Sequence, residues 1–203
     1  GVLLGAPILF RYQSALFVSG IVLWFIIIDK IQLKKLFVLT GAIITILFIG
    51  FFVDHWLYGN FPVTLYNYFN FNIIKDVASN YGVSPWYEYF FYVIKSPGPI
   101  GMFILLSFLI MLFNQSKNVI IWSIIPFLLV HSIIPHKELR FLFPLVYVTP
   151  LLLITGYQAI YKNIRTTLRI LIIILLAICN FAGILAVATT GASSHTSVSN
   201  FIH

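Results

Sequence analysis

Charge is what this sequence has least of. Only 12 of its 203 residues are Lys or Arg and 5 are Asp or Glu, so 8% are charged, whereas soluble domains carry about 25%. Apolar residues make up 61% of the chain and aromatic residues 17%. A soluble domain of this length would need more polar surface to stay dissolved. The composition therefore excludes a soluble globular protein and predicts an integral membrane protein.

Cysteine is nearly absent too. The single Cys179 lies in an apolar run, so no disulfide can form within the chain, and cysteine usage indicates no redox compartment. Asp and Glu form no cluster that suits a divalent ion, and His131 and His136 lack the neighbours of a zinc site. The sequence thus predicts no metal centre. The chain begins with Gly1 and shows no signal-peptide pattern, which is typical of a fragment or of a chain without its start.

Long apolar runs are what the sequence does contain. Membrane-spanning helices are predicted at about 14–28, 36–53, 98–113, 119–134, 141–160 and 168–188. Several runs are shorter than the roughly 20 residues that span a bilayer, but tilt and flanking aromatic residues can make up the difference. The predicted fold class is therefore all-α, a polytopic bundle of transmembrane helices. Residues 1–10 are interpreted as the end of an earlier apolar helix.

Basic residues in the connections orient these helices. The connections after the first, third and fifth predicted spans lie on one side of the membrane and hold seven Lys and Arg residues. The opposite side holds five Lys and Arg residues and every acidic residue except Asp29. Cytoplasmic connections carry an excess of Lys and Arg, so the first side is predicted to be cytoplasmic. The net charge of +7 is assigned to this bias and not to nucleic acid. The connection 54–97 and the tail 189–203 then lie on the non-cytoplasmic face.

The connection 54–97 is long enough to have structure of its own. Apolar residues recur at helical spacing from 66 to 77, which predicts an amphipathic helix in the membrane interface. Ser84 as N-cap and Pro85 at the first helical position predict a second short helix. The connection is also rich in Trp and Tyr. Two interpretations stay open: an aromatic belt at the headgroup level, or a platform for a sugar or a lipid head group.

Four ionisable residues fall within five positions of "PHKELRFLFP", residues 135–144: His136, Lys137, Glu138 and Arg140. A polar turn between two spans is the simple interpretation. However, the flanking prolines restrict the backbone, and ionisable groups at membrane depth usually face a cavity or a partner. A cationic turn suits a lipid-linked phosphate, which Arg binds in bidentate fashion and Lys as a point charge. Glu138 is a candidate base, although a role in orienting Lys137 or Arg140 is favoured, and His136 would donate a hydrogen bond or a proton.

These residues resemble a known family. "HKELRF" is similar to the signature of glycosyltransferase family 22, the polyisoprenyl-phosphate-mannose-dependent mannosyltransferases of N-glycan and glycosylphosphatidylinositol-anchor assembly. "DHWLYGNF", "YNYFNFN" and "SNYGVSPWYEYF" resemble, in that order, the family's luminal segment. "LFRYQSAL" is similar to its Arg-containing segment, where eukaryotic members more often have Arg-Pro-Thr. The resemblance covers residues 1 to about 160.

The resemblance implies the C-type glycosyltransferase fold, a single transmembrane domain of which 1–203 would be the C-terminal portion. It implies an enzyme that transfers a mannosyl or other hexosyl residue, with inversion, from a polyisoprenyl-phosphate sugar donor to a glycan or glycolipid acceptor. It also implies that no metal or other cofactor is needed. The reaction would take place on the non-cytoplasmic face of the bilayer.

The resemblance also implies roles for particular residues. The donor phosphate would be bound by His136, Lys137, Arg140 and Arg11, whereas Tyr58, Tyr81 and Trp86 would lie near the sugar or the lipid. The family's catalytic carboxylate lies in the first non-cytoplasmic loop, which would precede Gly1. We therefore expect residues 1–203 alone to be inactive.

Two other function classes are weighed against the enzyme. A transporter would carry ionisable residues within its spans and broken helices in paired positions, whereas the six apolar runs are nearly free of charge. A non-catalytic membrane scaffold would need no charged cluster at a helix mouth. A composition rich in Ile, Asn and Phe, with short connections, is more typical of a bacterial inner-membrane protein. In a eukaryote, the resemblance would imply the endoplasmic reticulum membrane.

Overall fold

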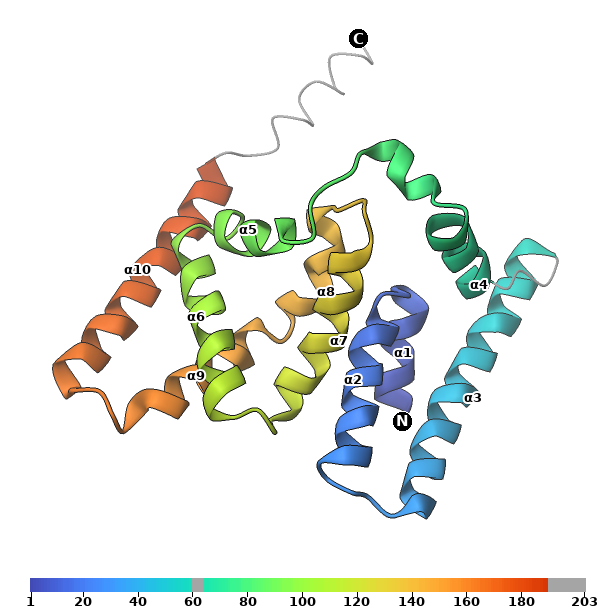
Figure 1. The fold of residues 1–203 in the computed structure, drawn as a ribbon, viewed down its shortest axis with the longest axis horizontal. Coiled ribbons are helices and arrows are strands. Elements are labelled where there is room, and N and C mark those ends of the chain that lie inside the picture. Colours follow the sequence, from blue (N-terminus) through green and yellow to red (C-terminus); the bar gives the residue numbers. More distant parts are fainter. Residues whose placement is uncertain (60–63, 190–203) are drawn as a thin grey trace, which may run out of the picture.

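In the computed structural model, residues 1–59 and 64–189 are described, and every regular element within them is a helix (Figure 1). The predicted all-α fold class is therefore confirmed for this part of the chain. Residues 60–63 of the predicted connection and residues 190–203 of the predicted tail lie outside the described residues.

The first three helices form one group. They are α1 (Val2–Phe10), α2 (Ser14–Ile27) and α3 (Leu33–Tyr58). α1 packs along α3, and a small buried core takes one residue from each helix: Ile8, Val18 and Ile43. α2 also packs along α7 and so joins this group to the second one.

The second group holds the remaining long helices. They are α5 (Glu88–Lys95), α6 (Pro99–Asn114), α7 (Val119–Ile133), α9 (Thr149–Tyr161) and α10 (Thr166–Thr189). α6 packs along α9, and α5 lies across the start of α6 (Figure 1). Met111, Ile121 and Leu152 are buried where α6, α7 and α9 meet. α10 packs against α6 and leaves most of its side chains exposed.

Two glycines allow close helix approach. A Cβ on Gly20 of α2 would collide with the backbone of Trp122 in α7, and a Cβ on Gly156 of α9 would lie 2.6 Å from the Cβ of Ser107 in α6. Small residues at such crossings are common in membrane proteins, where helices associate through close packing. The contact at Gly20 lies near the start of α7 and allows α2 to pack closely along that helix.

Several helices are apolar and long enough for a membrane. α3 and the part of α10 from Thr166 to Ala186 can each cross it, by length and composition. Two further pairs meet the same criteria only together and are bent: α6 with α7 by 115°, and residues 139–146 with α9 by 61°. These helices make the chain an integral membrane protein.

The predicted span 141–160 is not a single helix. It is divided into the 3₁₀ helix η3 (Leu139–Leu142), α8 (Phe143–Val146) and α9. Pro144 and Pro150 stand in the first turns of α8 and α9, where a residue without an N–H is tolerated. Neither proline can continue a preceding helix, and the chain bends by 61° between residues 139–146 and α9.

The connection after α3 begins later than the sequence suggests. α3 ends at Tyr58, and the next residue, Gly59, has a φ of 69°, the left-handed conformation that terminates helices. It is followed by α4 (Thr64–Phe69), the π-helix η1 (Asn70–Ile74) and the 3₁₀ helix η2 (Val77–Tyr81). The expectation of an N-cap at Ser84 is wrong, since α5 begins at Glu88. Ser84 is instead held to the segment after α7, because its N–H donates to the carbonyl of Pro135 at 3.0 Å.

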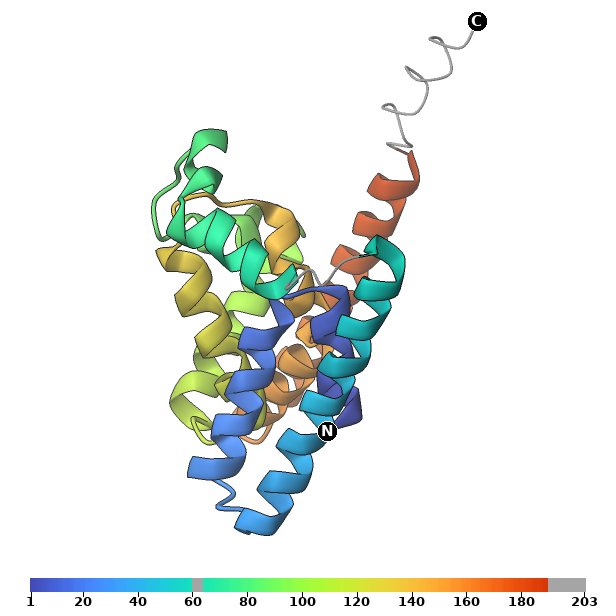
Figure 2. The ribbon, with the colours of Figure 1, turned by 90° about the vertical axis from the view of Figure 1, so that its right-hand side faces the viewer.

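Three non-contiguous parts of the chain gather at one end of the bundle. They are the turn between α1 and α2, the connection from α4 to α5, and the segment after α7 (Figures 1 and 2). The turns that join α2 to α3, α6 to α7 and α9 to α10 lie at the opposite end. The first of these ends carries the candidate site.

Candidate functional site

Residues 134–138 leave α7 in an extended conformation and lead into η3 at Leu139. Pro135 disfavours helical geometry at the residue before it, and Ile134 has φ −64° and ψ 126°. Glu138 is extended as well, with φ −131° and ψ 144°. Successive side chains of an extended chain point to opposite sides. Within residues 134–138, the side chain of Lys137 therefore lies on the opposite side of the chain from those of His136 and Glu138.

A charged network joins the side chains of His136, Glu138 and Arg140. His136 Nε2 donates to Glu138 Oε1 at 2.8 Å, and Arg140 Nη2 donates to the same oxygen at 2.9 Å. Arg140 Nε also pairs with Glu138 Oε2, so the guanidinium engages both carboxylate oxygens. His136 Nδ1 donates to the carbonyl of Gly82 at 3.0 Å. Because both partners of the imidazole are acceptors, the geometry favours the form in which both ring nitrogens carry a proton and the ring is a cation.

The network stabilises the charged form of each member. The pKa of His136 is raised above its ordinary 6.5, first by the hydrogen bond to Glu138 and next by that to the Gly82 carbonyl. The pKa of Glu138 is lowered below its ordinary 4.5, first by His136 and further by Arg140. With two cations and one carboxylate, the network is positive overall. Within the described residues, no group of three or more His, Cys, Asp or Glu side chains is placed to hold a metal ion.

The network lies on the wall of a cavity of about 840 Å³, which we call the polar cavity. The other walls come from residues 12–16 at the start of α2, from α4 and η2, and from the last turns of α7. Small-molecule sites usually measure about 300–1,000 Å³, so the polar cavity has room for a sugar phosphate.

Arg11 and Tyr81 reach the network from distant parts of the sequence. Arg11 Nη1 donates to the carbonyl of Arg140 at 2.7 Å, and its guanidinium lies 5.2 Å from the centre of the Phe143 ring. Tyr81 lines the polar cavity, with its ring centre 6.1 Å from that of His136. The structure thus brings both residues to the charged segment, Arg11 through the backbone and Tyr81 through the cavity.

Lys137 lies on the other side of the segment. Its side chain is buried (5% exposed), and its Nζ donates to the carbonyls of Ser132 at 3.0 Å and Ile134 at 2.6 Å. These carbonyls belong to the C-terminal end of α7, where a helix lacks donors and carries partial negative charge. The ammonium also lies 5.5 Å from the centre of the Tyr89 ring. Burial lowers the pKa of Lys137, and the charge of Glu88 opposes this.

Tyr58 and Trp86 lie apart from the charged network. Tyr58 ends α3 and is 67% exposed, and Trp86 is 65% exposed with its ring edge-on to Tyr87 and Phe90. The resemblance groups both with Tyr81. Within the described residues, however, Tyr81 alone of these three lines the polar cavity.

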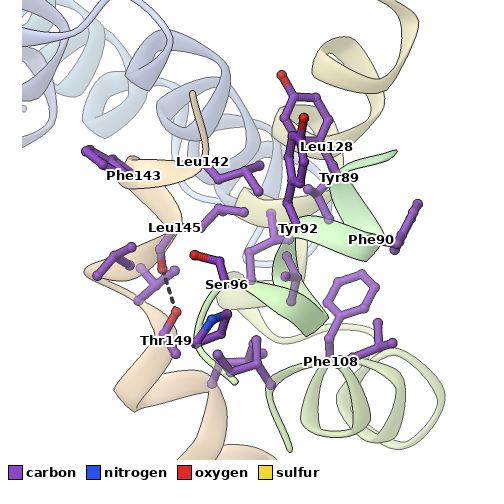
Figure 3. Close-up of a pocket in the computed structure, with 18 of the residues that line it drawn as sticks. Tyr89, Phe90, Tyr92, Ser96, Phe108, Leu128, Leu142, Phe143, Leu145 and Thr149 are labelled. Carbon is purple, nitrogen blue, oxygen red and sulfur yellow. Dashed lines mark hydrogen bonds between the residues drawn. The ribbon is translucent and has the colours of Figure 1, made fainter. Parts of the chain in front are cut away.

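A second cavity, of about 380 Å³, lies beside the same segment; we call it the apolar cavity. Its lining includes Leu139 and is almost wholly apolar. In Figure 3, Tyr92 and Phe108 approach it from α5 and α6, opposite Leu142 and Leu145. Thr149 points its hydroxyl at the backbone there, donating to the carbonyl of Leu145 at 2.9 Å. The charged segment therefore lies between two mainly apolar cavities, of which the polar cavity is the one lined by its ionised side chains.

The sequence that forms this site has recognisable relatives. The model of the Alg9-like mannosyltransferase family matches residues 2–202. The chain belongs to this family. The resemblance to glycosyltransferase family 22 is thereby confirmed over nearly the whole chain.

Curated relatives of the chain come from fungi, a mammal and a trypanosome. GPI mannosyltransferase 3 of Candida albicans is 28% identical over 123 residues, which are 61% of this chain and 24% of that protein. GPI alpha-1,2-mannosyltransferase 3 of Bos taurus is 31% identical over 97 residues, 46% of this chain and 17% of that protein. A probable Dol-P-Man:Man(7)GlcNAc(2)-PP-Dol alpha-1,6-mannosyltransferase of Schizosaccharomyces pombe is 27% identical over 146 residues, 70% of this chain and 26% of that protein.

The chain thus spans about a quarter or less of the length of these relatives. No solved structure is significantly similar to it.

In this Alg9-like chain, the structure adds cavity residues that sequence reasoning missed. Tyr12, Gln13, Tyr66 and His131 all line the polar cavity. Tyr12 and Gln13 had a usable signal, because they directly follow Arg11 in the segment that resembles the family's Arg-containing one. No signal in the sequence pointed to His131, because its position in the cavity wall depends on how the end of α7 packs beside α2.

Proposed function

We propose that the protein transfers a mannosyl residue from a polyisoprenyl-phosphate-mannose donor to a hydroxyl of a glycan or glycolipid, on the non-cytoplasmic face of the membrane. The observation that carries the proposal is the positive network of His136 and Arg140 on the wall of the polar cavity, in a chain of the Alg9-like mannosyltransferase family.

His136 and Arg140 suit the donor phosphate. Arg presents N–H groups in a planar fork that matches phosphate oxygens, and a cationic His adds a charge-assisted hydrogen bond. Glu138 orients both groups through bonds of 2.8 and 2.9 Å. Arg11 acts indirectly, because it positions Arg140 through a hydrogen bond to the backbone carbonyl of that residue. Lys137 is left out of the phosphate site because its ammonium faces α7.

The proposed reaction places charge where these cations lie. The acceptor oxygen forms a bond to the anomeric carbon as the bond from that carbon to the phosphate oxygen breaks. The phosphate keeps the electron pair and gains negative charge, which His136 and Arg140 stabilise. The acceptor proton must pass to a base. Glu138 already accepts from two donors, so we assign it to orientation. The resemblance places the base in a loop that precedes these residues.

The two cavities also match the two-part chemistry of the proposed donor. An isoprenoid phosphate joins a charged head to a long hydrocarbon chain, and hydrocarbon gains free energy when it leaves water for an apolar surface. The charged segment presents His136 and Arg140 to one cavity and Leu139 to the other. A head group in the polar cavity would therefore have apolar surface for its chain on the opposite side of the same segment.

Transport and scaffolding receive less support. Neither accounts for a membrane chain whose relatives are mannosyltransferases. Composition favours a bacterial inner membrane for this protein, with the polar cavity on the periplasmic side; in a eukaryote it would lie on the luminal side of the endoplasmic reticulum.

Charge reversal tests the proposal. The full-length protein carrying Arg140→Glu, reconstituted with a polyprenyl-phosphate-mannose donor, should lose transfer by about ten- to a hundredfold, because hydrogen bonds to charged groups contribute roughly 1.5–3 kcal/mol. Its thermal unfolding midpoint should stay close to that of the wild type, since Arg140 is exposed. Arg165→Glu is the matched control, an exposed Arg at the opposite end of the bundle. Full transfer by Arg140→Glu would refute the assignment of Arg140 to the phosphate.

A further inference from the structure

His131 is a buried polar residue that the proposed reaction does not use. It lies in the last turn of α7, is 3% exposed and lines the polar cavity. Its Nδ1 is 2.8 Å from the carbonyl oxygen of Phe127. A carbonyl only accepts, so Nδ1 carries the proton. In the neutral ring, Nε2 is then left as a hydrogen-bond acceptor. Among residues 1–59 and 64–189, no hydrogen bond to Nε2 is found.

Aromatic neighbours hold this imidazole in one orientation. Its ring stacks on Phe127 at a centroid distance of 4.2 Å, with 27° between the ring planes. The Tyr89 ring meets it edge-on at 6.2 Å. With the stacking on one side and the Nδ1 hydrogen bond along the helix, the ring has little freedom to turn. A fixed acceptor atom in a cavity is suited to selecting a donor group on a ligand.

Phe141 lies between the two histidines of the polar cavity. Its ring centre is 6.4 Å from that of His131 and 6.2 Å from that of His136, and all three residues line the cavity. This wall therefore presents a cationic imidazole, an apolar ring and an imidazole with an acceptor nitrogen in succession. A pyranose linked to phosphate has a matching sequence of features: a negative phosphate, an apolar C–H surface and a rim of hydroxyl donors.

We infer that His131 recognises the sugar of the donor: Nε2 accepts a hydrogen bond from one hydroxyl of the mannosyl group, whose C–H face packs on Phe141. This inference rests on the proposed function, because it takes the donor phosphate to be at His136 and Arg140. The two histidines have complementary roles. Phosphate oxygens only accept, so they are bound by the doubly protonated His136, whereas a hydroxyl can donate to His131 Nε2.

A comparison of two lipids tests the inference. The detergent-solubilised full-length protein is titrated with polyprenyl-phosphate mannose and with polyprenyl phosphate that lacks the sugar. His131→Phe keeps a ring against Phe127 but removes the acceptor nitrogen. It should weaken binding of the mannosylated lipid up to about tenfold, the order of one hydrogen bond, and leave binding of the plain phosphate lipid unchanged. His136→Gln, by contrast, should weaken both lipids.

A second measurement does not depend on how His131→Phe folds. In the wild type, a set of donors that each lack one mannose hydroxyl should include one that binds more weakly by a similar factor. That donor should bind equally well to the wild type and to His131→Phe. Equal losses for both lipids in His131→Phe, or no loss for either, would overturn the role of His131. Wild-type protein that binds neither lipid would instead overturn the donor proposal, and the inference with it.

Discussion

The two sides of the segment 134–140 place cations in opposite surroundings. On the cavity side, Arg140 is exposed and held by the carboxylate of Glu138. On the inward side, Lys137 is buried and held by the carbonyls of Ser132 and Ile134. A carboxylate partner leaves the guanidinium at the cavity wall, where a phosphate can approach it. The carbonyl partners of Lys137 instead keep its ammonium at the C-terminal end of α7, where it caps the helix.

This difference teaches that residue type and spacing do not assign a role within the charged segment. Lys137 and Arg140 are both cations of one short motif, and both suit phosphate chemically. Their roles differ because Lys137, in the extended residues 134–138, points away from His136 and Glu138, whereas Arg140, in η3, pairs with Glu138 on the wall of the polar cavity.

Removing the inward cation should have the largest effect on folding stability. Lys137→Met keeps the apolar stem but deprives two partly buried carbonyls of their donor, which costs about 1–3 kcal/mol at most. Thermal unfolding in detergent should show a lower midpoint. Hydrogen exchange of the ligand-free protein should rise at the end of α7 and in residues 134–140.

Lys137→Arg is the matched variant, because it keeps the charge and the donors, and it should recover part of the lost stability. If Lys137 instead contacts the donor phosphate, Lys137→Met would leave the unfolding midpoint and ligand-free exchange unchanged and would weaken donor binding alone. That result would remove the difference between the two sides of the segment.

The affinity of the polar cavity for a lipid phosphate should depend on pH. The pKa of His136 is raised above 6.5, first by Glu138 and next by the Gly82 carbonyl, while burial and the charge of Arg140 oppose this rise. His136 therefore stays charged below this raised value and loses its charge as the pH rises through it. Affinity for polyprenyl phosphate, measured across the pH range from 6 upward, should fall several-fold, up to about tenfold, in that interval.

Glu138→Gln sharpens this test because it removes the first cause of the raised pKa. The fall in affinity should then begin at lower pH, nearer the ordinary value of 6.5. A pH profile that is identical in the wild type and in Glu138→Gln would contradict the network as the source of the charge at the cavity.

Gly82→Ala should have the smallest effect. Gly82 has φ 114°, a conformation that side chains rarely adopt, although a Cβ there would meet no other atom. The substitution strains only the backbone that aims the carbonyl at His136. We expect a change of a few-fold in affinity for polyprenyl phosphate. Gly41→Ala, at an open helical position of α3, should leave that affinity unchanged. Equal effects of both substitutions would argue against the Gly82 contact.

Much of the fold was accessible from local sequence. Sparse charge and long apolar runs predict an all-helical membrane protein because lipid leaves backbone groups no partner but one another. The span expected at 141–160 is divided between η3, α8 and α9 in the structure, and the prolines that begin the last two, Pro144 and Pro150, were visible in the sequence. The N-cap expected at Ser84 was wrong, because the segment that Ser84 pairs with, at Pro135, is distant in sequence.

The sequence by itself determined the class of protein, its family and the cationic motif, because composition, apolar run length and a short contiguous signature are local properties. Tertiary structure alone decided which members of that motif meet the polar cavity. The direction of Lys137 depends on where α7 ends, and the place of His131 depends on the packing of α2 against α7, where Gly20 permits close approach. These relations join residues far apart in the chain, so no local pattern records them.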